Sequence, residues 1–348
     1  MIKKLIIIIT SIVIITTIWQ CCNSFNSPID DNESPAYLDS ITLASLQKVD
    51  NYPFYTMRYY SDYHFAEFAN RSSINWKEID NSFVSKDSAW ACTCFAALGD
   101  INNFLFGRNF DWHELVPLLL YTDPEISYAS ISMVDLEYFG YDRNNLPDEW
   151  DNRQDLLGTP WMPFDGMNEK GLTVGVMAVP NARPPYDPNK ISVDEIAAVR
   201  LLLDFAEDVD EAINLMSQYN IVMTDPPIHY LVADASGNAV VIEFVNGEMK
   251  TIRNTEPWLV STNFIISGST APHNVSCWRY DRAYNDLASS NGALSIIQGM
   301  NTLQKVSQSN TRWSTLYNIK NKDVHIALGT DYYHVLTYSF SQFSISVH

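Results

Sequence analysis

Positive charge is scarce in this sequence, and several common signatures of function are missing. The 348 residues include 22 lysines and arginines against 41 aspartates and glutamates, a formal net charge of −19 at pH 7. Nucleic-acid binding needs a basic surface, so this charge argues against a DNA or RNA partner. The five cysteines and seven histidines show no zinc-site spacing, so we expect neither a metal nor a cofactor. Internal repeats and low-complexity segments are also lacking.

Only the N-terminus has a long uncharged apolar run. Residues 1–22 begin with two lysines, continue with an apolar stretch over 5–19, and end on Cys21 and Cys22. A membrane span needs about 20 apolar residues, so the segment is typical of a secretory signal. A cysteine directly after such a run resembles a bacterial lipoprotein site and predicts lipidation at Cys21 or Cys22. Cleavage without lipidation and an uncleaved anchor are the alternatives. We expect an exported, extracytoplasmic protein that a lipid could tether to the membrane.

Residues 23–91 predict two kinds of segment. Asn, Ser, Pro and Asp dominate 23–36, which indicates a flexible tether. Residues 38–88 are dense in aromatic side chains and too apolar for a linker. We expect them to form a folded, partly helical pre-segment, either propeptide or small chain, packed on a catalytic domain that spans 92–348.

The clearest chemical signal lies at 92–111. Two apolar runs flank the turn-rich stretch GDINN, which predicts a β-hairpin. The returning strand would bring Arg108 and Asp111 beside Cys92. A nearby cation lowers a thiol pKa and favours the thiolate, so Cys92 is a candidate nucleophile. A buried inert cysteine and a structural Arg108–Asp111 ion pair are the alternatives. Cys94 shares a strand face with Cys92, and we expect it to be a packing residue.

These residues also carry a family resemblance. Cys92-Thr93, an apolar strand and the string GRNFD at 107–111 resemble the mature start of the linear amide C–N hydrolases, or choloylglycine hydrolase family. That family includes penicillin V acylases, bile salt hydrolases and acyltransferases of 6-aminopenicillanic acid. The string DGMNEKGL at 165–172 matches one of its hallmarks, and the resemblance covers most of 92–346.

The resemblance implies an α+β fold, the four-layer αββα sandwich of N-terminal nucleophile hydrolases. It also implies that the precursor cuts itself between Ala91 and Cys92, after which the free α-amine of Cys92 is the base for its own thiol. In this scheme Asp111 orients the α-amine, and Arg108 fixes the thiolate or the scissile carbonyl group. No histidine is needed.

Two further site residues come from the resemblance. Asn263 matches a family Thr-Asn that donates to the oxyanion, and Arg279 matches an arginine that supports the nucleophile. By local sequence alone, Asn263 is a turn residue and Arg279 a surface helix residue. Bile salt hydrolases carry an Asn where this chain has Ala178, so a backbone N–H would be the second oxyanion donor. Bile salts are therefore a weaker substrate guess.

The sequence thus predicts a cysteine amidohydrolase, similar to penicillin V acylase, that cleaves the linear amide of a small N-acyl compound. An acyltransferase, which passes the acyl-thioester to an amine, would use the same residues. A silent binding lipoprotein is the non-enzymatic alternative. Nothing in the sequence indicates the acyl group, the leaving amine or the oligomeric state.

Hydrophobic patterns predict several elements away from the site. Alternation over 126–141 indicates a strand, and Ser192 is a candidate N-cap for a helix with apolar residues on one face. Further helices are expected at 210–219, 278–288 and 294–306, followed by C-terminal strands.

Overall fold

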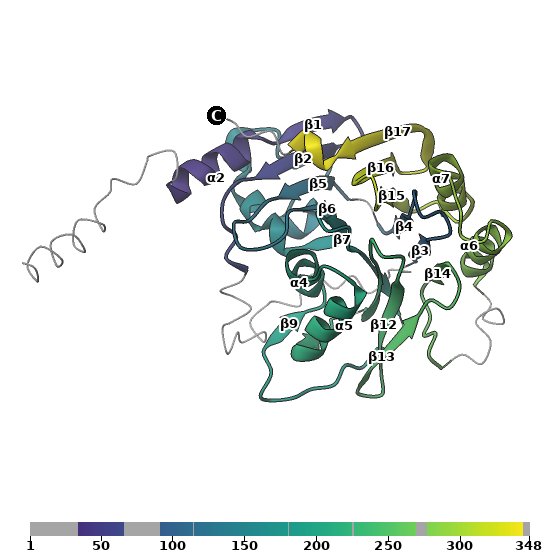
Figure 1. The fold of residues 1–348 in the computed structure, drawn as a ribbon. Coiled ribbons are helices and arrows are strands. Elements are labelled where there is room, and N and C mark those ends of the chain that lie inside the picture. Colours follow the sequence, from purple (N-terminus) through teal and green to yellow (C-terminus); the bar gives the residue numbers. More distant parts are fainter. Residues whose placement is uncertain are drawn as a thin grey trace, which may run out of the picture.

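The computed structural model of the chain describes residues 34–65, 91–113, 115–179, 181–224, 226–268 and 277–343. Two large β-sheets form its centre (Figure 1). The signal segment and the cysteines at its end, Cys21 and Cys22, lie outside the described residues. None of the described helices is long and apolar enough to cross a membrane.

The larger sheet has nine strands and is antiparallel except where β2 runs parallel to β5. In spatial order its strands are β1 Gln47–Asp50, β2 Phe54–Tyr59, β5 Pro117–Thr122, β6 Ser130–Asp135, β7 Pro163–Asn168, β8 Thr173–Ala178, β11 Ile228–Ala233, β12 Ala239–Val245 and β13 Glu248–Arg253.

The smaller sheet has six antiparallel strands. They are, in spatial order, β14 Trp258–Ser261, β3 Thr93–Ala97, β4 Leu105–Asp111, β15 Thr311–Asn318, β16 Asp323–Leu328 and β17 Asp331–Ser339. A separate parallel pair consists of β9 Ser192–Asp194 and β10 Asn220–Val222.

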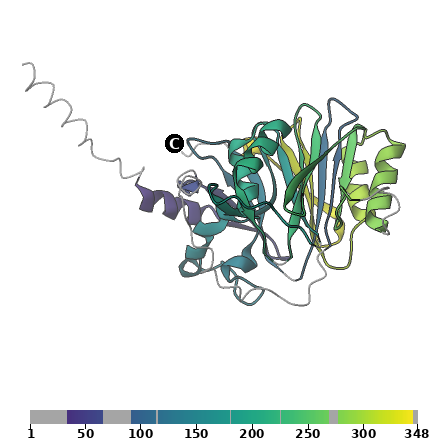
Figure 2. The same ribbon diagram turned by 90° about the horizontal axis from the view of Figure 1, so that it is seen from below.

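Helices cover the outer faces of both sheets. The nine-stranded sheet packs against α4 Ala197–Phe205 and α5 Val209–Gln218, and the six-stranded sheet against α6 Trp278–Ser289 and α7 Ile296–Lys305. Figure 2 shows the sheets between these two groups, with the light-green α6 and α7 at one side. Smaller elements are α2 Pro35–Ala44, α8 Phe340–Phe343 and the 3-10 helices η4 Leu136–Phe139, η5 Trp150–Asn152 and η6 Gln154–Trp161. The order helix, sheet, sheet, helix confirms the predicted αββα sandwich.

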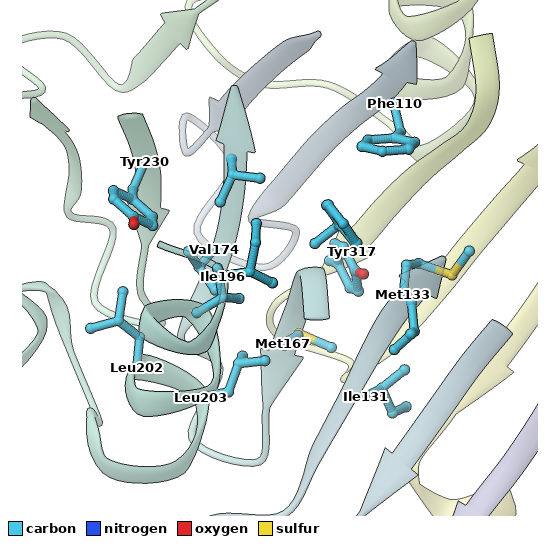
Figure 3. Close-up of a cluster of buried hydrophobic side chains, with 14 of the residues drawn as sticks. Phe110, Ile131, Met133, Met167, Val174, Ile196, Leu202, Leu203, Tyr230 and Tyr317 are labelled. Atoms are coloured by element: carbon cyan, nitrogen blue, oxygen red, sulfur yellow. The ribbon is translucent and has the colours of Figure 1, made fainter. Parts of the chain in front are cut away.

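Strand alternation divides the apolar side chains between two cores. On β3, Cys94 and Ala96 belong to the cluster between the sheets, whereas Phe95 and Ala97 belong to the cluster under α6 and α7. The large cluster continues through the nine-stranded sheet to α4, where Leu202 packs (Figure 3). Cys94 therefore faces the interior between the two sheets.

Two predicted boundaries were wrong. The strand expected over 126–141 is only β6, because Asp135 caps η4 by accepting a hydrogen bond from the Glu137 N–H. The helix expected from Ser192 begins at Ala197, since residues 192–194 pair with β10 instead. There the carboxylate of Asp194, not Ser192, accepts the first N–H groups, including that of Ala197.

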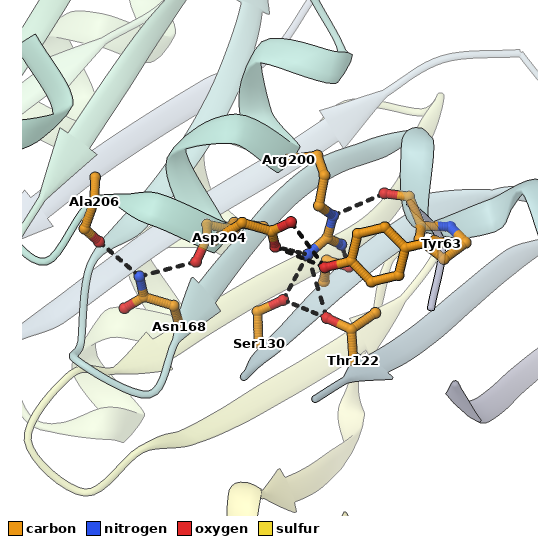
Figure 4. A network of polar contacts seen from close by, with 10 residues as sticks. Tyr63, Thr122, Ser130, Asn168, Arg200, Asp204 and Ala206 are labelled. Atoms are coloured by element: carbon orange, nitrogen blue, oxygen red, sulfur yellow. Dashed lines mark hydrogen bonds and ion pairs between the residues drawn. The ribbon is translucent and has the colours of Figure 1, made fainter. Parts of the chain in front are cut away.

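The described part of the pre-segment lies within the main body. Ser34 caps α2, so the predicted tether over 23–36 ends in helix rather than in coil. Strand β2 inserts between β1 and β5 and is almost entirely buried. Beyond it, the Tyr63 hydroxyl donates to Asp204, which also accepts from the buried guanidinium of Arg200 (Figure 4).

Candidate active site

The predicted hairpin is present and places Cys92 at one end of it. Strands β3 and β4 pair antiparallel, with Thr93 opposite Asn109 and Cys94 opposite Arg108. Cys92 directly precedes β3 and is fully buried. The returning strand therefore brings Arg108 to the thiol, as the spacing predicted.

Arg108 links the two sheets next to the thiol. Its Nη2 lies 3.8 Å from Cys92 Sγ and donates to the Val176 carbonyl at 2.7 Å, while Nη1 lies 2.6 Å from Asp165 Oδ2. A Cβ on Gly175 would lie 3.0 Å from both Arg108 Cδ and Cys94 Sγ. Glycine at 175 thus lets strand β8 approach the buried guanidinium closely.

Asp165 is a buried acceptor that the sequence interpretation missed. Besides Arg108, its carboxylate accepts hydrogen bonds from Trp313 Nε1 at 3.0 Å, Thr315 Oγ1 at 3.1 Å and Tyr317 Oη at 2.5 Å. Burial, together with the charge of Asp165, raises the pKa of Tyr317 well above its ordinary value. The string DGMNEKGL was interpreted only as a family marker with a turn. The available signal was Asp165 itself, a carboxylate beside apolar residues in what proves to be a fully buried strand. A buried carboxylate needs a partner.

The main chain of Cys92 is held by two residues from distant parts of the sequence. Its N–H donates to Asn263 Oδ1 at 2.7 Å, and its carbonyl accepts from Arg279 Nη1. Arg279 also donates to Thr93 Oγ1 at 3.0 Å and to Asn263 Oδ1 at 2.9 Å. Asn263 in turn donates from Nδ2 to the Ala178 carbonyl at 2.7 Å. Arg279 is buried at the start of α6, not a surface residue.

Asp111 meets Cys92 through its backbone rather than through its carboxylate. The Asp111 backbone lowers the pKa of the Cys92 thiol, whereas the charge of the Asp111 carboxylate raises it. Its carboxylate accepts from Thr311 Oγ1 at 2.5 Å and from Gln308 Nε2 at 2.7 Å. The alternative of an Arg108–Asp111 ion pair was wrong, because Arg108 pairs with Asp165. Positions three apart on a strand point to opposite faces. The role of Asp111 toward a free α-amine stays a prediction.

The protonation of the thiol differs from the simple expectation. Burial raises the pKa of Cys92, while Arg108 and the Asp111 backbone oppose that rise without cancelling it. Burial also raises the pKa of the Asp111 carboxyl, against the hydrogen bonds from Thr311 and Gln308. With the bond between Ala91 and Cys92 intact, the thiol is therefore held in its neutral form.

Cys94 is the second thiol beside Arg108. It is fully buried, and burial raises its pKa. Cys92, Cys94 and Cys277 are all free thiols. Among the described residues, no group of three or more His, Cys, Asp or Glu side chains is placed to hold a metal ion.

Solved structures share this architecture. Penicillin V acylase from Agrobacterium tumefaciens matches with a TM-score of 0.52 at 18% identity, over 72% of this chain and 87% of its own. A mutant of conjugated bile acid hydrolase from Clostridium perfringens matches with a TM-score of 0.54 at 14% identity, over 72% and 93%. The fold is that of the N-terminal nucleophile hydrolases.

Sequence comparison gives the family. Residues 92–264 match the family described as linear amide C–N hydrolases, choloylglycine hydrolase family, and the chain belongs to it. A penicillin V acylase of Pectobacterium atrosepticum is 25% identical over 191 residues, 50% of this chain and 49% of its own. An uncharacterized protein of Paramecium bursaria Chlorella virus 1 is 31% identical over 110 residues, 29% of this chain and 39% of its own. The chain thus spans less than half the length of these curated relatives.

Proposed function

We propose that this chain is an amidohydrolase that cleaves a linear amide C–N bond in a small N-acyl compound, with Cys92 as its nucleophile. The observation that carries the proposal is the set of hydrogen bonds to the main chain of Cys92. Asn263 holds its nitrogen and Arg279 its carbonyl oxygen, while Arg108 contacts its thiol. An inert packing cysteine has no need of three polar side-chain partners.

The first step of the mechanism is self-cleavage. The Cys92 thiol attacks the carbonyl carbon of Ala91, and the nitrogen of Cys92 leaves as an amine, which gives a thioester. Water then hydrolyses this thioester and releases residues up to Ala91 as a carboxylate. The new α-amine has a reference pKa of about 7.7–8.0, which suits proton transfer near neutral pH.

Turnover follows from the same groups. The α-amine takes the thiol proton, and the thiolate attacks the substrate amide carbonyl to form a tetrahedral oxyanion. The Asn263 amide carries two N–H hydrogens, and Ala178 uses one of them, so the second is available to this oxyanion. The protonated α-amine then gives its proton to the leaving amine. Water hydrolyses the acyl-thioester, which releases the acid and restores the thiol.

Other residues prepare the nucleophile. The positive charge of Arg108 favours the thiolate once the site opens, and Asp165 keeps that charge in place. Because Cys92 is fully buried in the continuous chain, substrate entry is expected to depend on cleavage of the bond before it.

The substrate is an N-acyl amide of the kind named for the curated relative, such as penicillin V. The test is a panel of fluorogenic N-acyl amides of different chain length, given to protein that lacks residues 1–22. Cleavage by the wild type and none by Cys92→Ala is the expected result. An added amine acceptor that diverts the acyl group from acid to amide would identify an acyltransferase instead. A processed wild type that cleaves nothing, yet binds an acyl compound, would favour the binding protein. Export and a lipid at Cys21 or Cys22 belong to the same proposal.

A further inference from the structure

A buried histidine and a buried glutamate lie behind the candidate site. His229 on β11 and Glu243 on β12 are neighbours across the strand pair, next to Tyr230 and Ile242 in the register. Both side chains are fully buried, and His229 Nδ1 lies 3.1 Å from Glu243 Oε1. No step of the mechanism above uses either group.

The pair holds both ends of the segment that carries Asn263. His229 Nε2 lies 2.8 Å from the Thr262 carbonyl oxygen and 3.1 Å from Ser261 Oγ. Glu243 accepts the backbone N–H of Ile266 through Oε1 at 2.7 Å, and that of Ser267 through Oε2 at 2.9 Å. Residues 261–267 thus join the six-stranded sheet to the nine-stranded sheet through these two side chains.

The contacts also assign the protons of the imidazole. Nδ1 faces a carboxylate oxygen and Nε2 faces a carbonyl oxygen, and both of these oxygens can only accept. Two ring N–H donors satisfy both contacts, whereas a neutral ring would set a lone pair against one of the oxygens. Although burial raises the pKa of Glu243, His229 and the backbone N–H groups of Ile266 and Ser267 together outweigh burial and lower it. The contacts therefore favour an imidazolium beside a carboxylate.

We propose that His229 and Glu243 are positioning residues for amide cleavage. His229, as a doubly protonated imidazolium, and Glu243 fix the 261–267 segment so that Asn263 meets the nitrogen of Cys92. The proposal rests on the proposed function, since it assigns Asn263 a part in the reaction. A displacement of about 1 Å at such a group can cost about 10²-fold in rate. A buried pair that served stability alone would not change kcat in a variant that folds.

The first test measures the wild-type protein and uses variants only to assign its signals. Nitrogen-15 spectra of histidine-labelled wild type near neutral pH should show both ring nitrogens of His229 carrying protons. The His229 signals are those that disappear in His229→Gln or, if that variant does not fold, in His229→Asn. An unprotonated ring nitrogen at His229 would overturn the imidazolium.

The second test separates positioning from stability. The double variant His229→Gln/Glu243→Gln keeps hydrogen-bonding groups but removes both buried charges. We expect kcat to fall about 10- to 100-fold while KM changes less than about threefold. The matched control is His334→Gln, which breaks the exposed His334–Asp331 pair at 2.7 Å and should leave kcat unchanged.

Full kcat in a folded double variant would overturn the positioning role. A wild type that cleaves no amide would overturn the proposed function instead. In that case a crystal structure of the double variant still tests the positioning role. If the pair positions Asn263, the hydrogen bond between Asn263 and the Cys92 nitrogen should be lost in that variant. If no variant of the pair folds, the wild-type ring-nitrogen spectrum decides alone, with its signals assigned through the other six histidines.

Discussion

The carboxylate of Asp165 lies 2.6 Å from the guanidinium of Arg108 and holds it against the thiol of Cys92. Both charged groups are fully buried, and they come from different sheets, Asp165 from β7 and Arg108 from β4. Burial alone would lower the pKa of Arg108, but the charge of Asp165 outweighs burial and raises it. The cation beside the nucleophile therefore depends on a residue of the opposite sheet.

Asp165→Asn should destabilise the protein, because it leaves the buried charge of Arg108 without its counter-ion. Breaking a buried pair in this way costs about 3–5 kcal/mol. Urea unfolding followed by tryptophan fluorescence would measure the loss. The control is Asp151→Asn, at an exposed position on η5. An unchanged free energy of unfolding in Asp165→Asn would show that the pair contributes nothing to stability.

The two thiols beside Arg108 should behave differently. Cys92→Ala should abolish turnover and leave an uncut chain. It removes the sulfur that attacks the Ala91 carbonyl in self-cleavage and the substrate carbonyl in turnover. Cys94→Ala removes one small buried group, so it should retain most activity with a stability loss of about 1 kcal/mol. Amide turnover and a denaturing gel would check both. Activity in Cys92→Ala, with none in Cys94→Ala, would assign the nucleophile to the other thiol.

A pH effect is expected from Asp135, at the end of β6. Burial raises the pKa of this carboxyl from 3.8 to about 8 in the folded protein. Between these values the unfolded chain is ionised and the folded chain is protonated, so stability falls as pH rises. The slope is about 1.4 kcal/mol per pH unit for this one group.

Asp135→Asn removes that titration and still offers an acceptor to the Glu137 N–H that caps η4. The variant should be more stable than the wild type near pH 7.5 and similar to it near pH 4, by urea unfolding at both values. Asp151→Asn should follow the wild type at both. A gain of equal size at the two pH values would contradict the raised pKa.

The sequence predicted the local part of the site well, because local spacing determines a hairpin. Arg108 follows Cys92 by 16 residues and returns beside it on the next strand. Asn263 lies 171 residues from Cys92 and was assigned only through the family resemblance. Two other contacts depend on how the two sheets stack. They are the ion pair of Asp165 with Arg108, 57 residues apart, and the contact of His229 with the Thr262 carbonyl. Strand periodicity says which side chains face inward, not which of them meet.

Local hydrogen bonding also explains the missed boundaries. The pattern after Ser192 has helical periodicity, yet residues 192–194 pair with β10. The helix therefore begins only after Asp194, which accepts the Ala197 N–H. A partner strand that follows 28 residues later leaves no mark on the helical pattern itself.

The pre-segment should remain bound as a separate chain after the cut at Ala91. Its strand β2 pairs with β5 over five residue pairs, from Tyr55 with Leu118 to Tyr59 with Thr122. Removing this strand would expose apolar side chains at a cost of roughly 25 cal/mol per Å². A denaturing gel should show a large fragment that begins with Cys92, and a native column should show one particle. An active wild type with an intact bond before Cys92 would refute the mechanism.

Tyr63→Phe should weaken this docking, because the Tyr63 hydroxyl donates to both carboxylate oxygens of Asp204 at 2.8 Å (Figure 4). Loss of one donor to a buried carboxylate costs about 1–3 kcal/mol, since Asp204 keeps its bond from Arg200. The small chain should therefore dissociate at a lower urea concentration, as followed by size-exclusion chromatography. Tyr37→Phe, at an exposed position on α2 of the same segment, is the matched control. Equal dissociation of the two variants would mean that strand pairing alone holds the segment, and that the Tyr63–Asp204 contact adds nothing to it.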